Sequence, residues 1–519
     1  MKLLTFGPKQ ALAGLTGALL FVLSVTGLQA APAKSAEPGI DVILWFDTED
    51  YILPADDDAC KRLGQMLSER RIRATFKVVG EKARVLEARG RRDVVAALKK
   101  HDVAYHANFH SVHPTPTEYL AECGWLDGID EFIRREGGGA ADVRRIFGVR
   151  TLGCYGQPGS SWAPQAIAAL RQIGVAPHGV TCYVDEGDHV GLDSQPFWYA
   201  GALNVYHMGQ NCTRMELHDP AAVEPAQQRF SAIAARLRAN GGGLVSIYYH
   251  PCEWVHQQFW DGVNFSRGAN PPRENWRLPP QRPASETDSA FRRFGDYIDY
   301  IRRTPGVRFV TASDLPLIYP DAVRVDGASE GDVAEIASRI SGAGSAGLDF
   351  QRIGQRAYSV ADQFALLALA AGEMASGKTP RFPIKPEACF GPDSAPPQTQ
   401  LKTIPWPAFR DSVRDVVGFI QFEHRIPSRV FIGADPVAPA DFLFALAGVY
   451  QFHQKHGRLP LSEGVELGHG LEVLPARKVA EDSPGLFGGW VIHKEGFRAP
   501  KLLELARLQA WTLKPAVRK

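Results

Sequence analysis

Between Ile40 and Pro320 the chain alternates short apolar runs with segments whose apolar residues recur at helical spacing. This alternation is typical of parallel strands joined by helices, because each crossover must return the chain to the same end of the sheet. We expect strands at residues 40–46, 74–79, 103–105, 243–249 and 307–311, and helices at residues 59–69, 92–100 and 164–173. The sequence therefore predicts an α/β fold.

Three short groups of ionisable residues come directly after expected strands. They are Asp47, Glu49 and Asp50, then His106 and His110, then His250. The carboxyl ends of parallel strands meet at one edge of a sheet or barrel, where active sites are built. Carboxylates and imidazoles together are the ligand set of a divalent metal that assists hydrolysis. In these residue types, the chain thus resembles a metal-dependent hydrolase.

The spacing within these groups suggests metal ligands, a general base and a general acid, and each residue also has a structural alternative. His106 and His110 are four residues apart and could direct both imidazoles at one ion, although a pair with this spacing is also common by chance on a surface, and His113 competes as a partner of His110. Acidic residues after a buried strand are either solvated in a turn or neutralised by a cation. In the second case one carboxylate binds the ion and a neighbour acts as general base. His250 is either structural or a general acid.

Residues 1–33 have the order of a secretory signal peptide. Lys2 and Lys9 precede an apolar run from Ala11 to Leu28, and small residues follow it, which makes cleavage after Ala30 or Ala33 plausible. An uncleaved anchor is the alternative reading, since the run approaches spanning length. No later stretch is apolar enough to cross a membrane. We expect an exported protein, periplasmic or extracellular, with no integral membrane span after cleavage.

The charge balance and the cysteine spacing argue against a nucleic-acid-binding protein and against a structural zinc site. With 58 Lys and Arg against 57 Asp and Glu, nothing favours nucleic acid as a partner. The seven cysteines are scattered without zinc-finger spacing, so structural zinc is disfavoured. Export would permit disulfides, but the odd number leaves at least one thiol free.

After about residue 320 the pattern changes. Residues 328–519 are mainly helical in pattern and contain no new group of metal ligands. A faint internal repeat relates the run 360–370 to the run 438–447, which suggests a duplicated helical module in about residues 355–400 and 410–475. Chance similarity between Ala- and Leu-rich helices is the alternative.

The order of these features resembles the polysaccharide deacetylases of the NodB-like type, carbohydrate esterase family four, over about residues 38–320, within an expected catalytic domain of residues 38–322. The stretch Phe46-Asp47-Thr48-Glu49-Asp50 is similar to the family's first motif, and the stretch from His106 to His110 is similar to its second. The resemblance implies a distorted (β/α) barrel that binds a zinc-like ion and removes acetyl groups from N-acetylated sugars. It assigns Asp47 as general base, and His106, His110 and Asp50 as metal ligands, with Glu49 as the alternative to Asp50.

The third motif of the family resembles the stretch from Tyr155 to Trp162. Gly156 stands where the family has an arginine that orients the general base, so either another cation substitutes or the activity is altered. The resemblance implies that the backbone amide of Gly159 stabilises the oxyanion, and that Pro158 belongs to the substrate-binding surface.

The remaining motifs complete the expected site. Residues 193–198 are similar to the fourth motif, which implies that Trp198 forms a wall of the acetyl pocket. Residues 244–250 are similar to the fifth, which makes His250 the general acid. Residues 251–283 resemble a long loop, whose Trp254 and Trp260 could stack on sugar rings, with packing inside the loop as the alternative.

These observations predict an exported, metal-dependent deacetylase, with zinc as the expected ion and an N-acetylated surface or cell-wall glycan as partner. Two alternatives stay open. The missing arginine also suits an inactive glycan-binding protein on a deacetylase scaffold, and the leaving group could belong to another amide or ester. Residues 426–433, which lead into the expected helix around Phe442, faintly resemble helical modules that bind cell-wall polymer.

Overall fold

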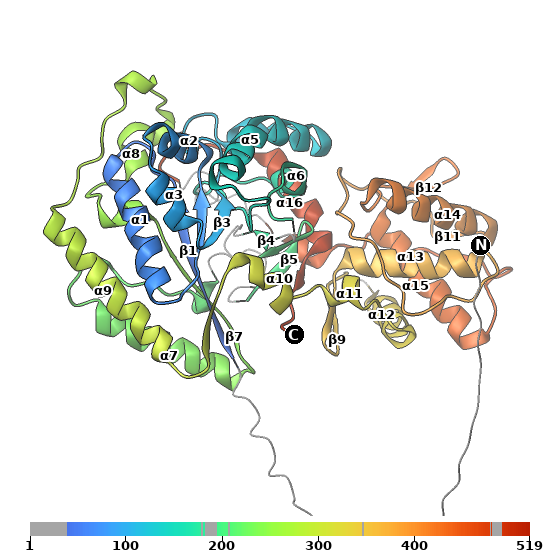
Figure 1. The fold of residues 1–519 in the computed structure, drawn as a ribbon. Helices are drawn as coiled ribbons and strands as arrows, with labels where there is room; N and C mark the ends of the chain where they lie inside the picture. Colours follow the sequence, from blue (N-terminus) through green and yellow to red (C-terminus); the bar gives the residue numbers. More distant parts are fainter. Residues whose placement is uncertain are drawn as a thin grey trace, which may run out of the picture. The chain divides into compact units, whose positions relative to one another are not determined.

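The expected strands form one parallel sheet around β1 (Ile40–Thr48), which is buried along its whole length (Figure 1). On one side β1 pairs with β7 (Gly243–Tyr249); on the other it pairs with β8 (Val307–Val310) along its first half and with β2 (Thr75–Val78) along its second. Beyond β2 lies β3 (Asp102–Tyr105). Strands buried on both faces have apolar runs rather than alternation, which explains the pattern of residues 40–46.

The structure is a computed structural model that describes residues 39–177, 180–181, 192, 195–205, 208–344, 347–477, 479 and 490–519. The signal peptide predicted in residues 1–33 lies outside the described residues, as do Cys182 and the start of the expected fourth motif, Asp193 and Ser194. The predicted α/β fold, with a parallel sheet and a mainly helical C-terminal region, is confirmed.

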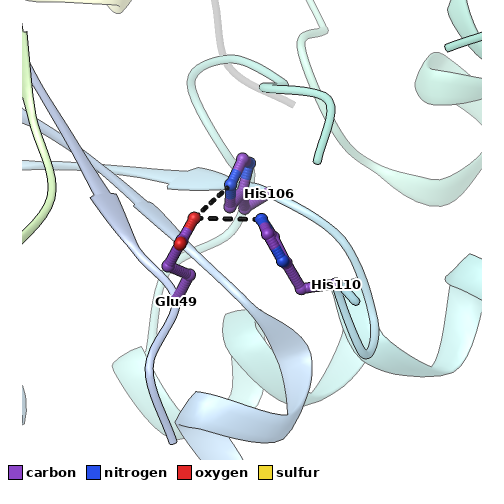
Figure 2. A group of neighbouring side chains, drawn as sticks. All are labelled: Glu49, His106 and His110. Carbon is purple, nitrogen blue, oxygen red and sulfur yellow. Dashed lines mark hydrogen bonds and ion pairs between the residues drawn. The ribbon is translucent and has the colours of Figure 1, made fainter. Parts of the chain in front are cut away.

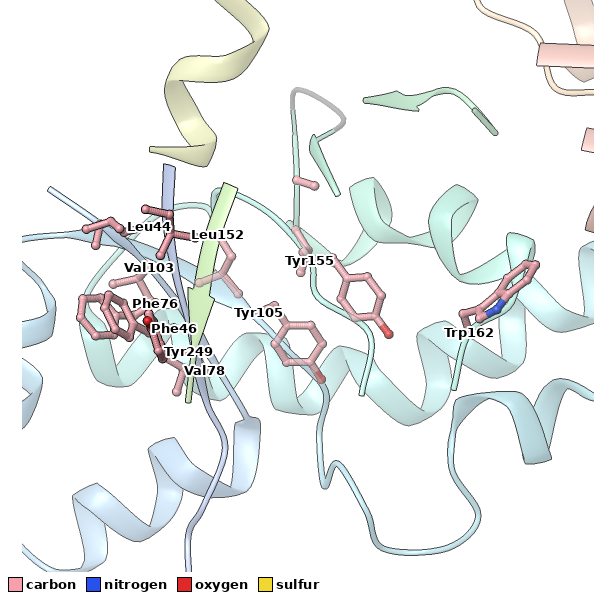
Figure 3. Packing of buried hydrophobic residues seen from close by; sticks show 14 of the residues in the cluster. Leu44, Phe46, Phe76, Val78, Val103, Tyr105, Leu152, Tyr155, Trp162 and Tyr249 are labelled. Atoms are coloured by element: carbon pink, nitrogen blue, oxygen red, sulfur yellow. The ribbon is translucent and has the colours of Figure 1, made fainter. Parts of the chain in front are cut away.

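Side chains of β1 alternate between two apolar clusters. Ile40, Val42, Leu44 and Phe46 belong to a large cluster, while Ile43 and Trp45 belong to a smaller one on the other side of the strand. Figure 3 shows part of the large cluster, in which Phe46 stacks on Phe76 of β2 at a centroid distance of 4.8 Å. The rigid sheet holds the ends of β1, β2, β3 and β7 in place, and these ends carry the ionisable residues.

Helices connect and cover the strands. In the α/β part they are α1 (Pro54–Glu69), α2 (Gly80–Ala88), α3 (Arg92–Leu98), α4 (Pro116–Leu120), α5 (Trp125–Phe147), α6 (Pro164–Ala169), α7 (Val223–Ala239), α8 (Trp260–Asn264), α9 (Ala284–Arg303) and α10 (Leu315–Ile318). Three of them, α1, α3 and α6, lie where helices were expected at residues 59–69, 92–100 and 164–173. The region 251–283, expected as a long loop, contains short helical turns, among them α8 and a 3-10 turn at Pro251–Trp254.

Beyond β3, single bridges continue the parallel order, from Tyr105 to Tyr155 and from Leu152 to Val175. A smaller sheet follows, in the order β15 (Lys514–Pro515), β5 (Phe197–Tyr199), β6 (Ala202–Asn204) and β4 (Val180–Thr181). The extreme C-terminal strand thus pairs with a strand of the α/β part, and α16 (Pro500–Gln509) contributes Leu502, Leu503 and Leu505 to the large apolar cluster. The last residues of the chain are therefore part of the α/β structure.

A second apolar cluster holds the helical region together. After α11 (Ala322–Val325), the order helix, β-hairpin, helix occurs twice. The first unit is α12 (Glu330–Gly342), β9 (Gln351–Ile353), β10 (Arg356–Tyr358) and α13 (Val360–Ala375); the second is α14 (Trp406–Glu423), β12 (Val430–Ile432), β13 (Asp435–Val437) and α15 (Pro439–His456). The hairpins begin at residues 351 and 430 and the second helices at 360 and 439, an equal offset. β11 (Thr403–Ile404) pairs with β14 (Val465–Glu466).

Within the described residues, six cysteines are free thiols: Cys60, Cys123, Cys154, Cys212, Cys252 and Cys389. No helix in this part of the chain is both long enough and apolar enough to cross a membrane.

Candidate metal centre and active site

Glu49, His106 and His110 meet at the carboxyl end of the sheet (Figure 2). Glu49 directly follows β1, and His106 directly follows β3. The Oε2 atom of Glu49 lies 3.0 Å from Nε2 of His106 and 3.0 Å from Nε2 of His110. All three side chains are buried, and their ligand atoms lie within 4.8 Å of one another. This is a carboxylate and imidazole set of the kind that binds zinc.

Neighbouring groups engage Nδ1 of both histidines and so direct Nε2 toward Glu49. Nδ1 of His106 lies 2.7 Å from the carbonyl oxygen of Gly156, which can only accept, so Nδ1 carries the proton. Nδ1 of His110 lies 2.6 Å from Oγ of Ser111, and that hydroxyl donates to Asp261 Oδ2 at 3.1 Å. With Nδ1 as the donor in both rings, Nε2 of each histidine is directed toward Glu49 and would offer its lone pair to an ion held between them.

Glu49 is oriented in the same way. The indole N–H of Trp260 donates to Oε1 of Glu49 at 2.8 Å, which leaves Oε2 facing the histidines. Burial alone would raise the pKa of Glu49, but the neighbouring imidazoles hold it well below its usual value, so the side chain is an anion. One carboxylate and two imidazoles, which are neutral when they bind a metal, fit a divalent cation such as zinc.

The structure differs from the sequence-based assignment at Asp50, which was the preferred ligand, and supports the alternative, Glu49. Asp50 Oδ1 accepts from the backbone N–H groups of Ile52 and Leu53 at 2.7 and 3.1 Å, and its Oδ2 lies 2.8 Å from His256 Nε2. Successive side chains of an extended chain point to opposite sides, so residues 47 and 49 face the site and residue 50 turns away. Asp50 stabilises the loop.

Asp47 lies next to the metal centre in a charged environment. Its Oδ1 is 2.5 Å from Nζ of Lys77, and its Oδ2 is 3.6 Å from Nε2 of His250. Burial would raise the pKa of Asp47, but Lys77, His106 and His250 lower it overall. Asp47 is therefore an ionised carboxylate at neutral pH, as a general base must be.

Lys77 is a buried cation beside Asp47 and is packed against Gly156, where the sequence analysis noted the absence of an expected arginine. It is 1 % exposed, and its backbone is in register with Asp47 across the pairing of β1 and β2. A Cβ atom at position 156 would come within 2.6 Å of Lys77 Cδ and 2.9 Å of its Nζ. The absence of a side chain at position 156 therefore leaves room for the side chain of Lys77. The sequence does contain a signal for this contact, namely a lysine inside the apolar run 74–79, but sequence analysis assigned that lysine no role.

His250 faces Asp47 from the end of β7. Its Nδ1 lies 2.7 Å from Oε1 of Glu253, which also accepts from the backbone N–H of His250 at 2.9 Å. Burial opposes the charged form, but the carboxylates of Glu49, Glu253 and Asp47 together raise the pKa of His250 to about 9. His250 is therefore protonated at neutral pH and able to act as an acid. Sequence analysis gave Glu253 no role.

Titration of His250 tests this arrangement. In the metal-free protein we expect the imidazole signal of His250 in an NMR titration to have its midpoint near pH 9, and the substitution Glu253→Gln to move it downward, because the imidazolium loses an anionic partner. Since this pKa lies above the value of about 6.5 in an unfolded chain, the charged histidine stabilises the fold below pH 6.5, and this contribution is lost as the pH rises through about 9. A midpoint near 6.5 in the unsubstituted protein would contradict this account.

The two tryptophans expected to stack on sugar, Trp254 and Trp260, are buried inside the protein. Trp254 is 0 % exposed and packs against Phe46, Tyr249 and Phe294 in the core. Trp260 is also 0 % exposed, and it holds Glu49. A bound sugar cannot reach either ring in this structure, because the apolar surface that suggested stacking is used for packing.

The other expected substrate-binding residues lie in two places. Pro158 is buried in the loop after Tyr155, and Gly159 in the same loop is exposed, with a positive φ of 49°. Trp198 is partly buried in β5, packed against the smaller of the two clusters that flank β1. The indole of Trp490 lies against Gly159, and sequence analysis did not single out this residue.

Comparisons with known proteins found similar solved structures only. No protein-family model matches the chain, and no curated protein matches its sequence. Among solved structures the chain is similar to one described as a polysaccharide deacetylase from Mycobacterium smegmatis, with 15% identity over 55% of this chain and 92% of that one, and a TM-score of 0.35. It is also similar to PuuE allantoinase (12% identity, 54% and 91% covered, TM-score 0.35) and to the peptidoglycan deacetylase PdaC from Bacillus subtilis (14%, 55% and 93%, TM-score 0.27).

Polysaccharide and peptidoglycan deacetylases are thus among the solved structures that this chain resembles. At this level of similarity the chemistry has to be inferred from the side chains of the site itself.

Proposed function

We propose that the chain is a metal-dependent deacetylase that hydrolyses the acetamide of an N-acetylated surface or cell-wall glycan. The observation that carries this proposal is the buried group of Glu49, His106 and His110, with Asp47 and His250 beside it. A metal-binding group, an ionised carboxylate and a protonated imidazole are together what hydrolysis of an amide needs. The motif order and its resemblance to polysaccharide deacetylases support the acetylated sugar as substrate.

Glu49, His106 and His110 would hold the ion, through the oxygen and the two Nε2 atoms that already converge. When bound, a zinc-like ion supplies Lewis-acid polarisation of the acetamide carbonyl and lowers the pKa of water. The neighbouring Asp261 and Ser111 fix His110, and the carbonyl of Gly156 fixes His106, so the protein orients the ligands in advance.

The residues of the chain carry the proton transfers. Water attacks the acetamide carbonyl carbon, and Asp47 accepts the proton that the water loses. We assign the backbone N–H of Gly159, in the exposed loop after Tyr155, to the developing oxyanion. When the C–N bond breaks, His250 donates its proton to the nitrogen, which leaves as the amine, and acetate is the second product. Lys77 holds the carboxylate of Asp47 toward the site throughout.

Acetate release from a panel of N-acetylated glycans tests the function. The chain should be stripped of metal, then reloaded with zinc or cobalt, and activity is expected to return only after reloading. If the loaded protein binds the ion but releases acetate from no glycan, its substrate is another amide or ester. If it binds no metal, an inactive glycan-binding protein becomes the better interpretation.

Asp47→Asn tests the role of the general base. We expect kcat to fall by roughly 10²–10⁴-fold, the usual contribution of a positioned base, while the zinc content measured by mass spectrometry stays at one ion per chain. The isosteric amide keeps the shape of the side chain but cannot accept the proton. Asp58→Asn, at an exposed position of α1, is the matched control and should leave kcat unchanged. Full activity of Asp47→Asn would contradict the assignment.

We also propose that the protein is exported and acts in the periplasm or outside the cell, which residues 1–33 support through their sequence alone. Determining the N-terminus of the mature protein tests this, and cleavage after Ala30 or Ala33 is the expected result.

A further inference from the structure

A segment near the end of the chain, residues 490–493, lies against the candidate metal centre. It is joined to the loop after α8 by two backbone hydrogen bonds of 2.8 and 2.7 Å, from Arg267 N–H to the Val491 carbonyl and from Gly268 N–H to the Ile492 carbonyl. The same part of the chain carries Trp260, which holds Glu49. The segment is therefore fixed to the wall of the active site, although it is about 380 residues from His110 in sequence.

Two side chains that follow Trp490 in the segment are buried. Ile492 is fully buried in an apolar cluster with Tyr51, Trp260 and Phe265. His493 is buried as well, and its Nε2 lies 3.0 Å from Oγ1 of Thr115. These contacts hold the backbone of the segment in one place, so the position of Trp490 is set by the fold.

The indole of Trp490 reaches two parts of the site. Its ring centroid is 5.5 Å from that of His110, and the two planes are nearly perpendicular at 88°. A Cβ atom at position 159 would lie within 2.6 Å of three atoms of the indole. Only glycine at 159 therefore allows the ring to lie on this loop, beside the backbone amide that we assign to the oxyanion.

Unlike Trp254 and Trp260, Trp490 is only partly buried. A partly exposed indole offers apolar surface with a polar N–H edge, which suits the apolar face of a sugar ring. The surface stands next to a metal-ligating histidine and the exposed loop of Gly159, where the acetylated sugar has to bind.

We propose that Trp490 is a substrate-contacting residue, on which the sugar ring that carries the acetamide packs, and that the C-terminal segment thereby completes the active site. This inference rests on the proposed function. It makes residues 490–493 part of the catalytic unit rather than of a separate binding module.

The test compares Trp490→Ala and Trp490→Phe in the full-length mature chain loaded with zinc. The probe is the tetramer of N-acetylglucosamine. We expect Trp490→Ala to raise KM by 10-fold or more with a fall in kcat of less than 3-fold, because it removes a binding surface and leaves the reacting groups in place. Trp490→Phe, which keeps a flat ring, should recover most of the affinity. Phe422→Ala, an exposed aromatic of the helical region, is the matched control and should leave KM unchanged.

Binding is measured separately from turnover, by calorimetry of the tetramer with Asp47→Asn protein and with the double variant Asp47→Asn/Trp490→Ala. A 10-fold weaker affinity of the double variant supports the proposal. An affinity and a KM within 2-fold of those of the parent proteins would overturn it, and so would a fall in kcat that follows loss of zinc, because Trp490 would then only support His110. A failure of the proposed function is distinguishable, since it appears as absence of acetate release by the unsubstituted chain.

Discussion

Glu49→Gln is expected to abolish stoichiometric zinc binding and, with it, acetate release, whereas Asp50→Asn is expected to keep one zinc per chain. The structure shows why neighbouring acids should behave so differently. Oε2 of Glu49 lies 3.0 Å from both histidine Nε2 atoms, while both oxygens of Asp50 are engaged by the loop and by His256. Glutamine retains the hydrogen bond with Trp260 but removes the negative charge that a divalent cation needs.

Metal content by mass spectrometry and thermal unfolding separate the two effects. Asp50→Asn should lower the melting temperature, since it weakens a buried hydrogen-bonded pair with His256, and removing one partner of such a pair costs about 1–3 kcal/mol. Glu49→Gln should instead lose the increase in melting temperature that zinc gives to the unsubstituted protein. Zinc bound by Glu49→Gln and lost by Asp50→Asn would reverse our assignment of the ligand.

Lys77→Ala is expected to lower kcat by about 100-fold while zinc remains bound. Its Nζ lies 2.5 Å from Asp47 Oδ1, and both groups are buried, so the substitution removes the cation that holds the base. A general base displaced by about 1 Å can cost about 10²-fold in rate. The free energy of unfolding should also fall, by about 3–5 kcal/mol, because a buried charge loses its partner.

Placing a cation at position 156 in a protein that lacks Lys77 tests whether kcat depends on a positive charge beside Asp47 or only on the stability of the fold. The three atoms nearest to a Cβ at Gly156 all belong to Lys77, so truncating that lysine makes room for a side chain at 156. We expect Lys77→Ala/Gly156→Arg to recover a large part of kcat, and Lys77→Ala/Gly156→Gln, with an uncharged side chain, to recover little. Gly156→Arg alone should be destabilising, since its Cβ would meet Lys77 at 2.6 Å. Equal rescue by glutamine and arginine would show that Lys77 only fills space.

Local patterns in the chain were sufficient to predict the five strands of the main sheet and the helices α1, α3 and α6, because burial on two faces imposes a continuous apolar run and crossovers impose helical periodicity. The longer helices α5, α7 and α9 were not predicted. Local patterns also located the groups that form the site. Asp47 lies at the carboxyl end of β1, while His106, His110 and His250 directly follow a strand or lie in the loop after it, and parallel pairing brings such positions together.

Choices between neighbouring residues could not be made in this way. Glu49 and Asp50 are both acidic and adjacent, and which of them faces the histidines depends on how the chain leaves β1. The tryptophans of residues 251–283 were similarly ambiguous, because an indole serves equally well in a core or on a binding surface. The structure buries Trp254 and Trp260 and leaves Trp490 partly exposed.

The sequence by itself determined the α/β fold, the edge of the sheet that carries the chemistry and the kind of residues found there, since these depend on periodicity and on residue type. Only the tertiary structure decided which partners those residues have. Lys77 faces Asp47 because two strands pair in register and position 156 has no side chain, and Trp490 reaches His110 because the end of the chain packs back onto the α/β part. Both contacts join residues far apart in sequence, and their energies depend on shape and distance in the folded molecule, which no local pattern records.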